Sequence, residues 1–141
     1  MRKLILLIGN VGTGKSTWVK NLKQRENRKI FVCDSIEPCP NGEDVIHSLM
    51  MSLQRGMTVI IDGNNITKKD REMYFQIAGK NTPAIAIDFG IGNEQTIKNR
   101  IESNTNKSST EWTNIHLQKQ QIYQFPDYAE GFTKIYKVRY Y

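Results

Sequence analysis

Five short runs of strand-forming residues recur along the chain, separated by segments long enough for helices. The runs span residues 3–8, 30–33, 58–61, 84–89 and 134–139. The first, third and fourth are almost wholly apolar, which is typical of strands covered on both faces of a parallel sheet. The longest unbroken apolar run has five residues, 4–8, which is too short for a transmembrane helix or the core of a secretory signal.

The segments between these runs carry helical periodicity or helix start signals. They span residues 15–26, 43–55, 68–80, 93–103 and 110–123. Asn93 and Glu94, and the stretch 109–111, would supply N-terminal caps and first-turn carboxylates. The regular alternation of strand and helix predicts a three-layer α/β fold with a five-stranded parallel sheet and right-handed crossovers.

The whole chain, residues 1–141, is expected to form one domain, because it contains no internal repeat or linker. Residues 104–110 are polar and rich in turn formers, so we expect a small lid over about residues 93–110. The two cysteines, Cys33 and Cys39, form neither a disulfide framework nor a zinc site. They favour a reducing, cytoplasmic setting.

The positive charge of the chain is concentrated near its N-terminus. The net charge is +6, yet residues 1–29 contain eight Lys or Arg and one acidic residue, and the other 112 residues have a net charge of −1. This local excess favours an anionic partner. Five of the basic residues lie on the first predicted helix and just after it: Lys20, Lys23, Arg25, Arg28 and Lys29. They either contact a nucleic-acid backbone or lie in solvent at the end of the helix.

A phosphate-binding motif follows the first predicted strand. The residues Gly9, Asn10, Val11, Gly12, Thr13, Gly14, Lys15 and Ser16 fit G-x-x-x-x-G-K-[ST], and Thr17 follows them. The setting between a buried strand and an amphipathic helix is the one this motif requires. We expect the backbone N–H groups to surround a triphosphate, Lys15 to reach its outer phosphates, and Ser16 to ligate Mg²⁺.

Two aspartates lie just past predicted strands, at the sheet edge where α/β proteins bind ligands. Asp62 closes the apolar run of residues 59–61, a pattern that supports Mg²⁺ and its waters. Asp34 closes the second strand, where a carboxylate can accept the proton of an attacking hydroxyl. Spacing alone leaves the alternative that either residue only forms a turn or caps a helix.

Four stretches of the chain together resemble the kinase domain of the polynucleotide 5′-kinase family, a branch of the P-loop kinases common in phages and close to zeta-toxin-like kinases. The first is the phosphate-binding loop with the following Trp18, and the second is Asp34. The third, residues 62–71, is similar to the family's D-x-T-N-[LI]-x-x-x-x-R stretch, and the fourth, residues 126–132, to its P-x-x-x-E-G-F segment.

The resemblance implies a P-loop kinase fold, with ATP and Mg²⁺ as cofactors and a 5′-hydroxyl end of DNA or RNA as the phosphoryl acceptor. It further implies that Asp34 is the general base, that Arg100 of the lid is catalytic, and that Asn65 and Arg71 bind the substrate. If the chain comes from a phage, its setting would be the host cytoplasm. Because relatives often carry a phosphatase or ligase as well, the end at Tyr141 suggests a kinase module alone.

The chain departs from the family pattern at three positions. Glu37 stands where relatives have an arginine that contacts a substrate phosphate, and Asn64 stands in place of a threonine. Relatives commonly carry two lid arginines, but the second position here is Asn104, with Lys107 as the nearest basic residue. These departures leave the substrate-phosphate clamp and the second lid cation to be identified.

Several alternatives stay open at this stage. A kinase of this type can phosphorylate a hydroxymethylated base in phage DNA, or a small molecule such as a nucleoside or nucleotide sugar. A nucleotide-binding switch without a phosphoryl acceptor is a third class, although such a switch would not need a general base at Asp34.

The roles of several aromatic residues also stay open. Tyr123, Phe125 and Tyr128 either stack on a nucleobase or pack in the core, and His116 is expected to be structural or exposed. The sequence leaves the oligomeric state open, and no membrane contact is expected.

Overall fold

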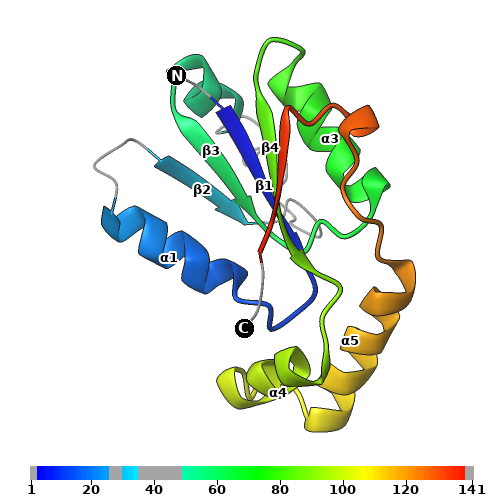
Figure 1. Ribbon diagram of the computed structural model, residues 1–141. Coiled ribbons are helices and arrows are strands. Elements are labelled where there is room, and N and C mark those ends of the chain that lie inside the picture. The colour runs from blue at the N-terminus through cyan, green and yellow to red at the C-terminus, as the bar shows by residue number, and fades with distance from the viewer. Residues whose placement is uncertain (1–2, 26–29, 35–48, 139–141) are drawn as a thin grey trace.

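A single sheet of five parallel strands forms the centre of the computed structural model, which describes residues 3–25, 30–34 and 49–138 (Figure 1). The strands lie in the order β2-β3-β1-β4-β5. Their bounds are β1 Lys3–Gly9, β2 Ile30–Asp34, β3 Thr58–Asp62, β4 Ala84–Gly90 and β5 Lys134–Lys137. The α/β class and parallel sheet predicted from the apolar runs are thereby confirmed.

The central position of β1 follows from its composition. Its residues from Leu4 to Gly9 are all buried, and it pairs with β3 on one side and β4 on the other. Because all the strands are parallel, their carboxyl ends share one edge of the sheet. Asp34 and Asp62, at the ends of β2 and β3, are direct register partners. The sheet therefore brings the two aspartates singled out in the sequence to neighbouring backbone positions.

Helices cover both faces of this sheet. The helices are α1 Lys15–Arg25, α3 Lys68–Ala78, α4 Glu94–Ser103 and α5 Ser109–Ile122, with a 3-10 turn at Tyr128–Glu130 and helical residues 49–54 before β3. Figure 1 shows α1 on one face of the sheet and α3 on the other. This arrangement gives the three layers that the strand and helix pattern predicts.

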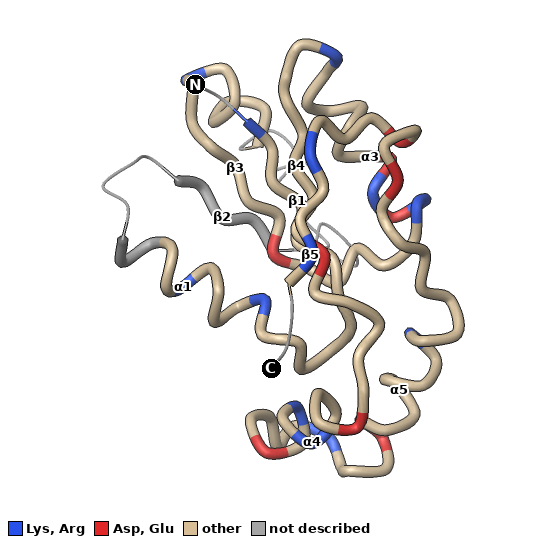
Figure 2. Tube along the Cα trace, viewed as in Figure 1, with Lys and Arg blue, Asp and Glu red and all other residues tan. Residues whose placement is uncertain are grey.

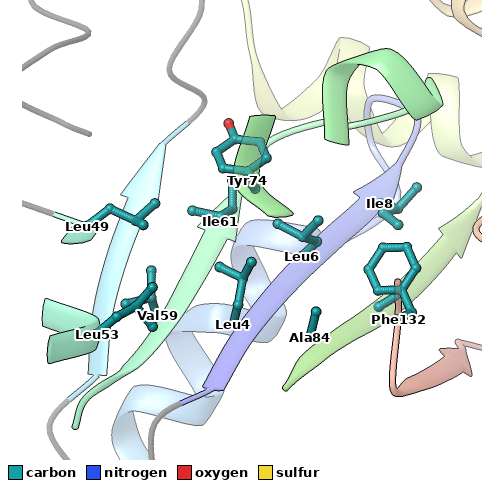
Figure 3. Close-up of a cluster of buried hydrophobic side chains, with 11 residues drawn as sticks. Leu4, Leu6, Ile8, Leu49, Leu53, Val59, Ile61, Tyr74, Ala84 and Phe132 are labelled. Carbon is teal, nitrogen blue, oxygen red and sulfur yellow. The ribbon is translucent and has the colours of Figure 1, made fainter. Parts of the chain in front are cut away.

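Alternate residues of each central strand feed two separate cores. On one face, Leu4, Leu6 and Ile8 of β1 pack with Tyr74 of α3 and Phe132 (Figure 3). On the other face, Ile5 and Leu7 pack with Val19 of α1. Full burial of each aliphatic side chain contributes about 1.5–3 kcal/mol to the stability of the fold. Because β1 has such side chains on both faces, it stabilises the packing of both helix layers against the sheet.

The helices α4 and α5 form a hairpin beyond the carboxyl edge of the sheet (Figure 1). Asn93 caps α4 as expected, whereas α5 is capped by Ser108 and begins at Ser109, one residue earlier than the predicted helix. The predicted lid therefore corresponds to α4, the turn after it and the start of α5. None of the helices in the described ranges is long and apolar enough to cross a membrane.

Candidate active site at the carboxyl edge of the sheet

The phosphate-binding loop joins the end of β1 to the first residue of α1, Lys15. Gly12 and Gly14 have φ angles of +77° and +92°, a region that only glycine adopts without strain. Gly12 also lies against α4, since a Cβ atom there would be 2.0 Å from the carbonyl oxygen of Thr96. The loop therefore turns as the motif requires and also contacts the lid hairpin.

Lys15 points into the loop. Its Nζ donates hydrogen bonds of 2.8 Å to the carbonyl oxygens of both Gly9 and Asn10, and its side chain is only 7% exposed. Its pKa is lowered to about 7, chiefly by burial and then by the nearby positive charges of Arg100 and Lys119, while the carboxylate of Asp62 acts in the opposite direction. A lysine held in this way gains a strong electrostatic partner when a phosphate approaches.

Ser16 and Asp62 form the oxygen pair that the sequence predicts for Mg²⁺. The hydroxyl of Ser16 donates to Oδ2 of Asp62 at 3.1 Å, which links the start of α1 to the end of β3. Two oxygen ligands from the protein suit Mg²⁺, because this ion keeps several waters and completes its coordination shell with substrate phosphates. Within the described ranges no cluster of three or more His, Cys, Asp or Glu can hold a metal by itself.

A pocket of about 860 Å³ opens beside this pair. Charged residues of the loop and the hairpin line it, namely Lys15, Arg100 and Lys119, together with Ser16 and Asp62. Its remaining lining comes from the loop after β3, from α3 and from Ile122 at the end of α5, with Met73 and Ile122 among its apolar members. The pocket thus combines a cationic, oxygen-bearing part with an apolar part.

Arg100 reaches this pocket from α4. Its guanidinium carbon lies 5.1 Å from the centre of the Trp112 ring, and its Nε is buried with no hydrogen-bond partner in the described part of the chain. Lys107 lies over the same ring, also at 5.1 Å, but does not line the pocket. Basic positions lie on α1, α4 and α5 around this region (Figure 2). Stacking on Trp112 therefore orients Arg100 without neutralising its charge.

The hairpin is fastened to the phosphate-binding loop by Asn10. Its Nδ2 donates to the carbonyl oxygens of Ile91 and His116, at 2.9 and 3.0 Å, and its Oδ1 accepts from the Val11 N–H at 2.7 Å. Asn10 is fully buried. A predicted phosphate-loop residue thus also sets where the hairpin sits, a role that the motif alone does not reveal.

His116 was expected to be either structural or exposed, and the structure places it in a buried, structural position. It is buried, its Nε2 lies 3.0 Å from Oγ1 of Thr96, and its ring closely contacts Gly92. Burial lowers its pKa, which favours the neutral ring. The residue therefore packs α5 against α4 and the end of β4.

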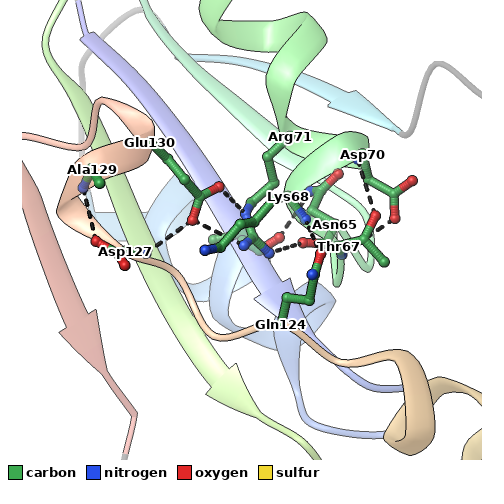
Figure 4. Close-up of polar contacts among 10 residues, drawn as sticks. Asn65, Thr67, Lys68, Asp70, Arg71, Gln124, Asp127, Ala129 and Glu130 are labelled. Atoms are coloured by element: carbon green, nitrogen blue, oxygen red, sulfur yellow. Dashed lines mark hydrogen bonds and ion pairs between the residues drawn. The ribbon is translucent and has the colours of Figure 1, made fainter.

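Arg71, for which the resemblance implies a contact with substrate, is not among the residues that line this pocket. Its side chain is completely buried, and its guanidinium is occupied by Glu130 and by the carbonyl oxygen of Asn65 (Figure 4). Asn65 has a φ of 47°, lines the pocket, and donates from Nδ2 to the Leu7 carbonyl at 2.9 Å. Arg71 is thus a positioning residue for the loop after β3.

Several predicted residues lie partly or wholly outside the described structure. The backbone of Asp34 is placed beside Asp62, but its side chain is not described. Glu37 and the side chains of Lys23 and Arg25 also lie outside the described part of the chain. Of the aromatic residues, Tyr123 donates a hydrogen bond from its hydroxyl to Oδ1 of the buried Asp88. Burial raises the pKa of this hydroxyl. Phe125 and Tyr128, in contrast, are more than half exposed.

Lys119 lines the pocket but is not among the residues predicted from the sequence. No motif marks it, but Trp112, His116 and Tyr123 lie at helical spacing from it and share its face of α5. Two of these three are buried, and Tyr123 is half-buried. The helical spacing of these residues would therefore predict that Lys119 lies on the buried side of α5.

No family model matches the chain, and no curated protein matches it in sequence. Solved structures do match its fold. A fungal RNA kinase superposes with a TM-score of 0.74 at 17% identity, covering 99% of this chain and 75% of that one. A chain of the Pnkp1/Rnl/Hen1 RNA repair complex gives a TM-score of 0.66 at 18% identity, covering 85% of this chain and 44% of that one. A gluconokinase from Sinorhizobium meliloti gives 0.57 at 12% identity, covering 96% and 81%.

The sheet order, the phosphate-binding loop and these likenesses define the class of the molecule. The chain has a P-loop kinase fold, and its likeness to the fungal RNA kinase and to the RNA repair complex supports the polynucleotide-kinase-like form of that fold. This confirms the fold that the resemblance implied. At such low identity the likeness concerns the fold alone, so substrate and activity must be argued from the site.

Proposed function

We propose that this protein is an ATP-dependent kinase that transfers the γ-phosphoryl group to a hydroxyl of nucleic acid, the 5′-OH end of DNA or RNA. The observation that carries the proposal is the meeting of Lys15, the Ser16–Asp62 pair and Arg100 in one pocket at the carboxyl edge of the sheet. Phosphoryl transfer depends on positioning and charge neutralisation, and these groups supply both.

ATP is proposed to bind with its phosphates on the N–H groups of residues 9–17, where the N-terminus of α1 adds a partial positive charge. Lys15 and Arg100 would contact the outer phosphates. Ser16 and Asp62 would hold Mg²⁺, which when bound neutralises part of the charge on the β- and γ-phosphates.

The proposed chemical step is an in-line displacement at the γ-phosphorus. The acceptor hydroxyl oxygen forms the new P–O bond, and the bond to the bridging oxygen of the β-phosphate breaks with its electron pair remaining on ADP. The hydroxyl proton passes to the carboxylate of Asp34. The position of the Asp34 backbone beside Asp62, at the end of β2, supports this role.

A nucleic-acid acceptor is favoured by two observations. Residues 1–29 have a net charge of +7, more than a single nucleotide requires. The similar solved structures include a fungal RNA kinase and a chain of an RNA repair complex. A small-molecule acceptor is the second candidate, because a pocket of about 860 Å³ also suits a small molecule and the fold is shared with a gluconokinase.

One acceptor panel separates these candidates. The protein is incubated with γ-labelled ATP and Mg²⁺ and offered a 5′-OH oligonucleotide, the same oligonucleotide with a 5′-phosphate, a hydroxymethylated duplex and free nucleosides. The proposal expects label on the 5′-OH oligonucleotide and none on its 5′-phosphorylated match. Label confined to the nucleosides would favour the small-molecule kinase, label on the duplex would favour a modified base, and release of phosphate alone would favour a switch.

A further inference from the structure

One face of α5 turns toward the sheet edge. Trp112, His116, Lys119 and Tyr123 are spaced at i, i+4, i+7 and i+11, so they follow one another along a single side of the helix. Trp112 and His116 are buried, and Tyr123 bonds to the buried Asp88. Lys119 therefore lies on the side of α5 that faces the protein.

Contacts on both sides of Lys119 hold this face in place. One turn before it, the carbonyl oxygen of His116 accepts from Asn10 of the phosphate-binding loop. Directly after it, Nε2 of Gln120 donates to the Gly92 carbonyl at 3.1 Å. Beyond the end of α5, the N–H of Gln124 donates to the carbonyl of Ile66 at 2.7 Å. These contacts hold this part of α5 against the phosphate-binding loop and the segment after β4, and they hold the chain just beyond α5 against the loop after β3.

The pocket that Lys119 lines is cationic. Its lining includes Lys15, Lys69, Arg100 and Lys119 against the carboxylates of Asp62 and Asp70. Asp70 is already engaged in the N-terminal cap of α3 with Thr67. Lys119 is half-buried and forms no ion pair in the described part of the chain. The positive charges of these side chains repel one another, and a bound polyanion would offset this repulsion.

Lys107, the nearest basic residue in sequence to the missing second lid arginine, does not reach this pocket. It lies in the turn between α4 and α5, with its Nζ 5.1 Å from the centre of the Trp112 ring. The position of the missing arginine, Asn104, instead accepts a hydrogen bond from Trp112 Nε1 through its carbonyl oxygen at 2.9 Å. The turn therefore places no second cation among the residues that line the pocket.

We propose that Lys119 is a catalytic residue of this kinase, contacting the transferred phosphoryl group together with Arg100. The inference rests on the proposed phosphotransferase function and identifies the second cation that the lid turn lacks. Charge spreads over three oxygens of the phosphoryl group in the transition state, and one cation from α4 and another from α5 would stabilise it from two helices. The ammonium of a lysine serves this purpose as a point charge.

The first test compares three variants that each remove one positive charge from the hairpin. Lys119→Gln should lower kcat about 10²- to 10³-fold, as loss of one transition-state donor does, with the Kd of ATP changed only a few-fold. Lys119→Arg should restore part of the rate. Lys98→Gln, on the exposed side of α4, is the matched control and should leave kcat unchanged. Loss of rate in Lys107→Gln with none in Lys119→Gln would overturn the inference.

A second readout does not depend on the acceptor. Aluminium fluoride with ADP and Mg²⁺ imitates the phosphoryl group in transfer, so it should tighten ADP binding to the wild-type protein and to Lys98→Gln but not to Lys119→Gln. If wild type phosphorylates no nucleic acid yet shows this difference, the inference about Lys119 stands and the proposed acceptor fails. Equal tightening in Lys119→Gln and wild type, or no tightening in either, would overturn the inference.

Discussion

The guanidinium of Arg71 and the carboxylate of Glu130 form a two-bond ion pair, with Nε to Oε1 at 2.8 Å and Nη2 to Oε2 at 3.0 Å. The third guanidinium nitrogen donates to the carbonyl of Asn65 at 2.8 Å. One side chain thus ties the start of α3 to the turn before β5 and to the loop that lines the pocket.

Removing one partner of this pair should destabilise the fold strongly. Glu130→Ala leaves the Arg71 guanidinium buried without its counter-ion, and the expected loss is about 3–5 kcal/mol in the free energy of unfolding. Chemical denaturation measures it. The double variant Arg71→Met with Glu130→Ala is the control and should lose less than the sum of the two single variants. Additive losses would show that the two side chains do not stabilise each other.

The part of the fold that depends on local pattern could be predicted from the sequence. The strand runs and the phosphate-binding loop are continuous stretches, so their apolar composition and motif spacing suffice to place them. The ion pair of Arg71 could not be predicted, because its partner Glu130 is 59 residues away and the two residues lie in separate stretches of the chain. Lys119 was missed for a related reason, since its place depends on which side of α5 faces Asn10.

The close contact of the phosphate-binding loop with α4 predicts a difference between two glycines. Gly12→Ala puts a Cβ against the Thr96 carbonyl in addition to the strain of a positive φ, whereas Gly14→Ala meets nothing within 4 Å and carries only the strain. We expect Gly14→Ala to cost about 1–2 kcal/mol of stability and Gly12→Ala clearly more, with at least a tenfold weaker ATP affinity. Equal effects would indicate that the contact between loop and hairpin does not matter.

The lowered pKa of Lys15 predicts proton uptake when ATP binds. With a pKa of about 7, only about a tenth of Lys15 is protonated at pH 8, and the phosphates favour the charged form. ATP affinity should therefore fall as the pH rises above 7, and binding at pH 8 should take up nearly one proton, measured by calorimetry in buffers of different ionisation enthalpy. The uptake should disappear in Lys15→Gln. Binding without uptake by wild type at pH 8 would mean that Lys15 is already charged.

The Ser16–Asp62 pair predicts which residue links Mg²⁺ to ATP binding. Asp62→Asn keeps the size of the side chain but removes the charge that a hard cation requires. The variant should lose most of the Mg²⁺-dependent gain in ATP affinity, while binding of ATP in chelator changes little. The matched control is Glu94→Gln, a charge removal in the first turn of α4, which should keep the gain. A full gain in Asp62→Asn would place the metal elsewhere.

Transfer to a nucleic-acid end is the central claim, and the most direct measurement follows phosphate onto a 5′-OH oligonucleotide while ATP binding is recorded in parallel. Mass spectrometry should show one added phosphate with wild type, and a 5′-phosphate-dependent exonuclease should then degrade the product. Asp34→Asn should bind ATP within a few-fold of wild type and add no phosphate, because the hydroxyl proton has no acceptor. An oligonucleotide left unchanged by wild type, or phosphorylated equally by Asp34→Asn, would contradict the account.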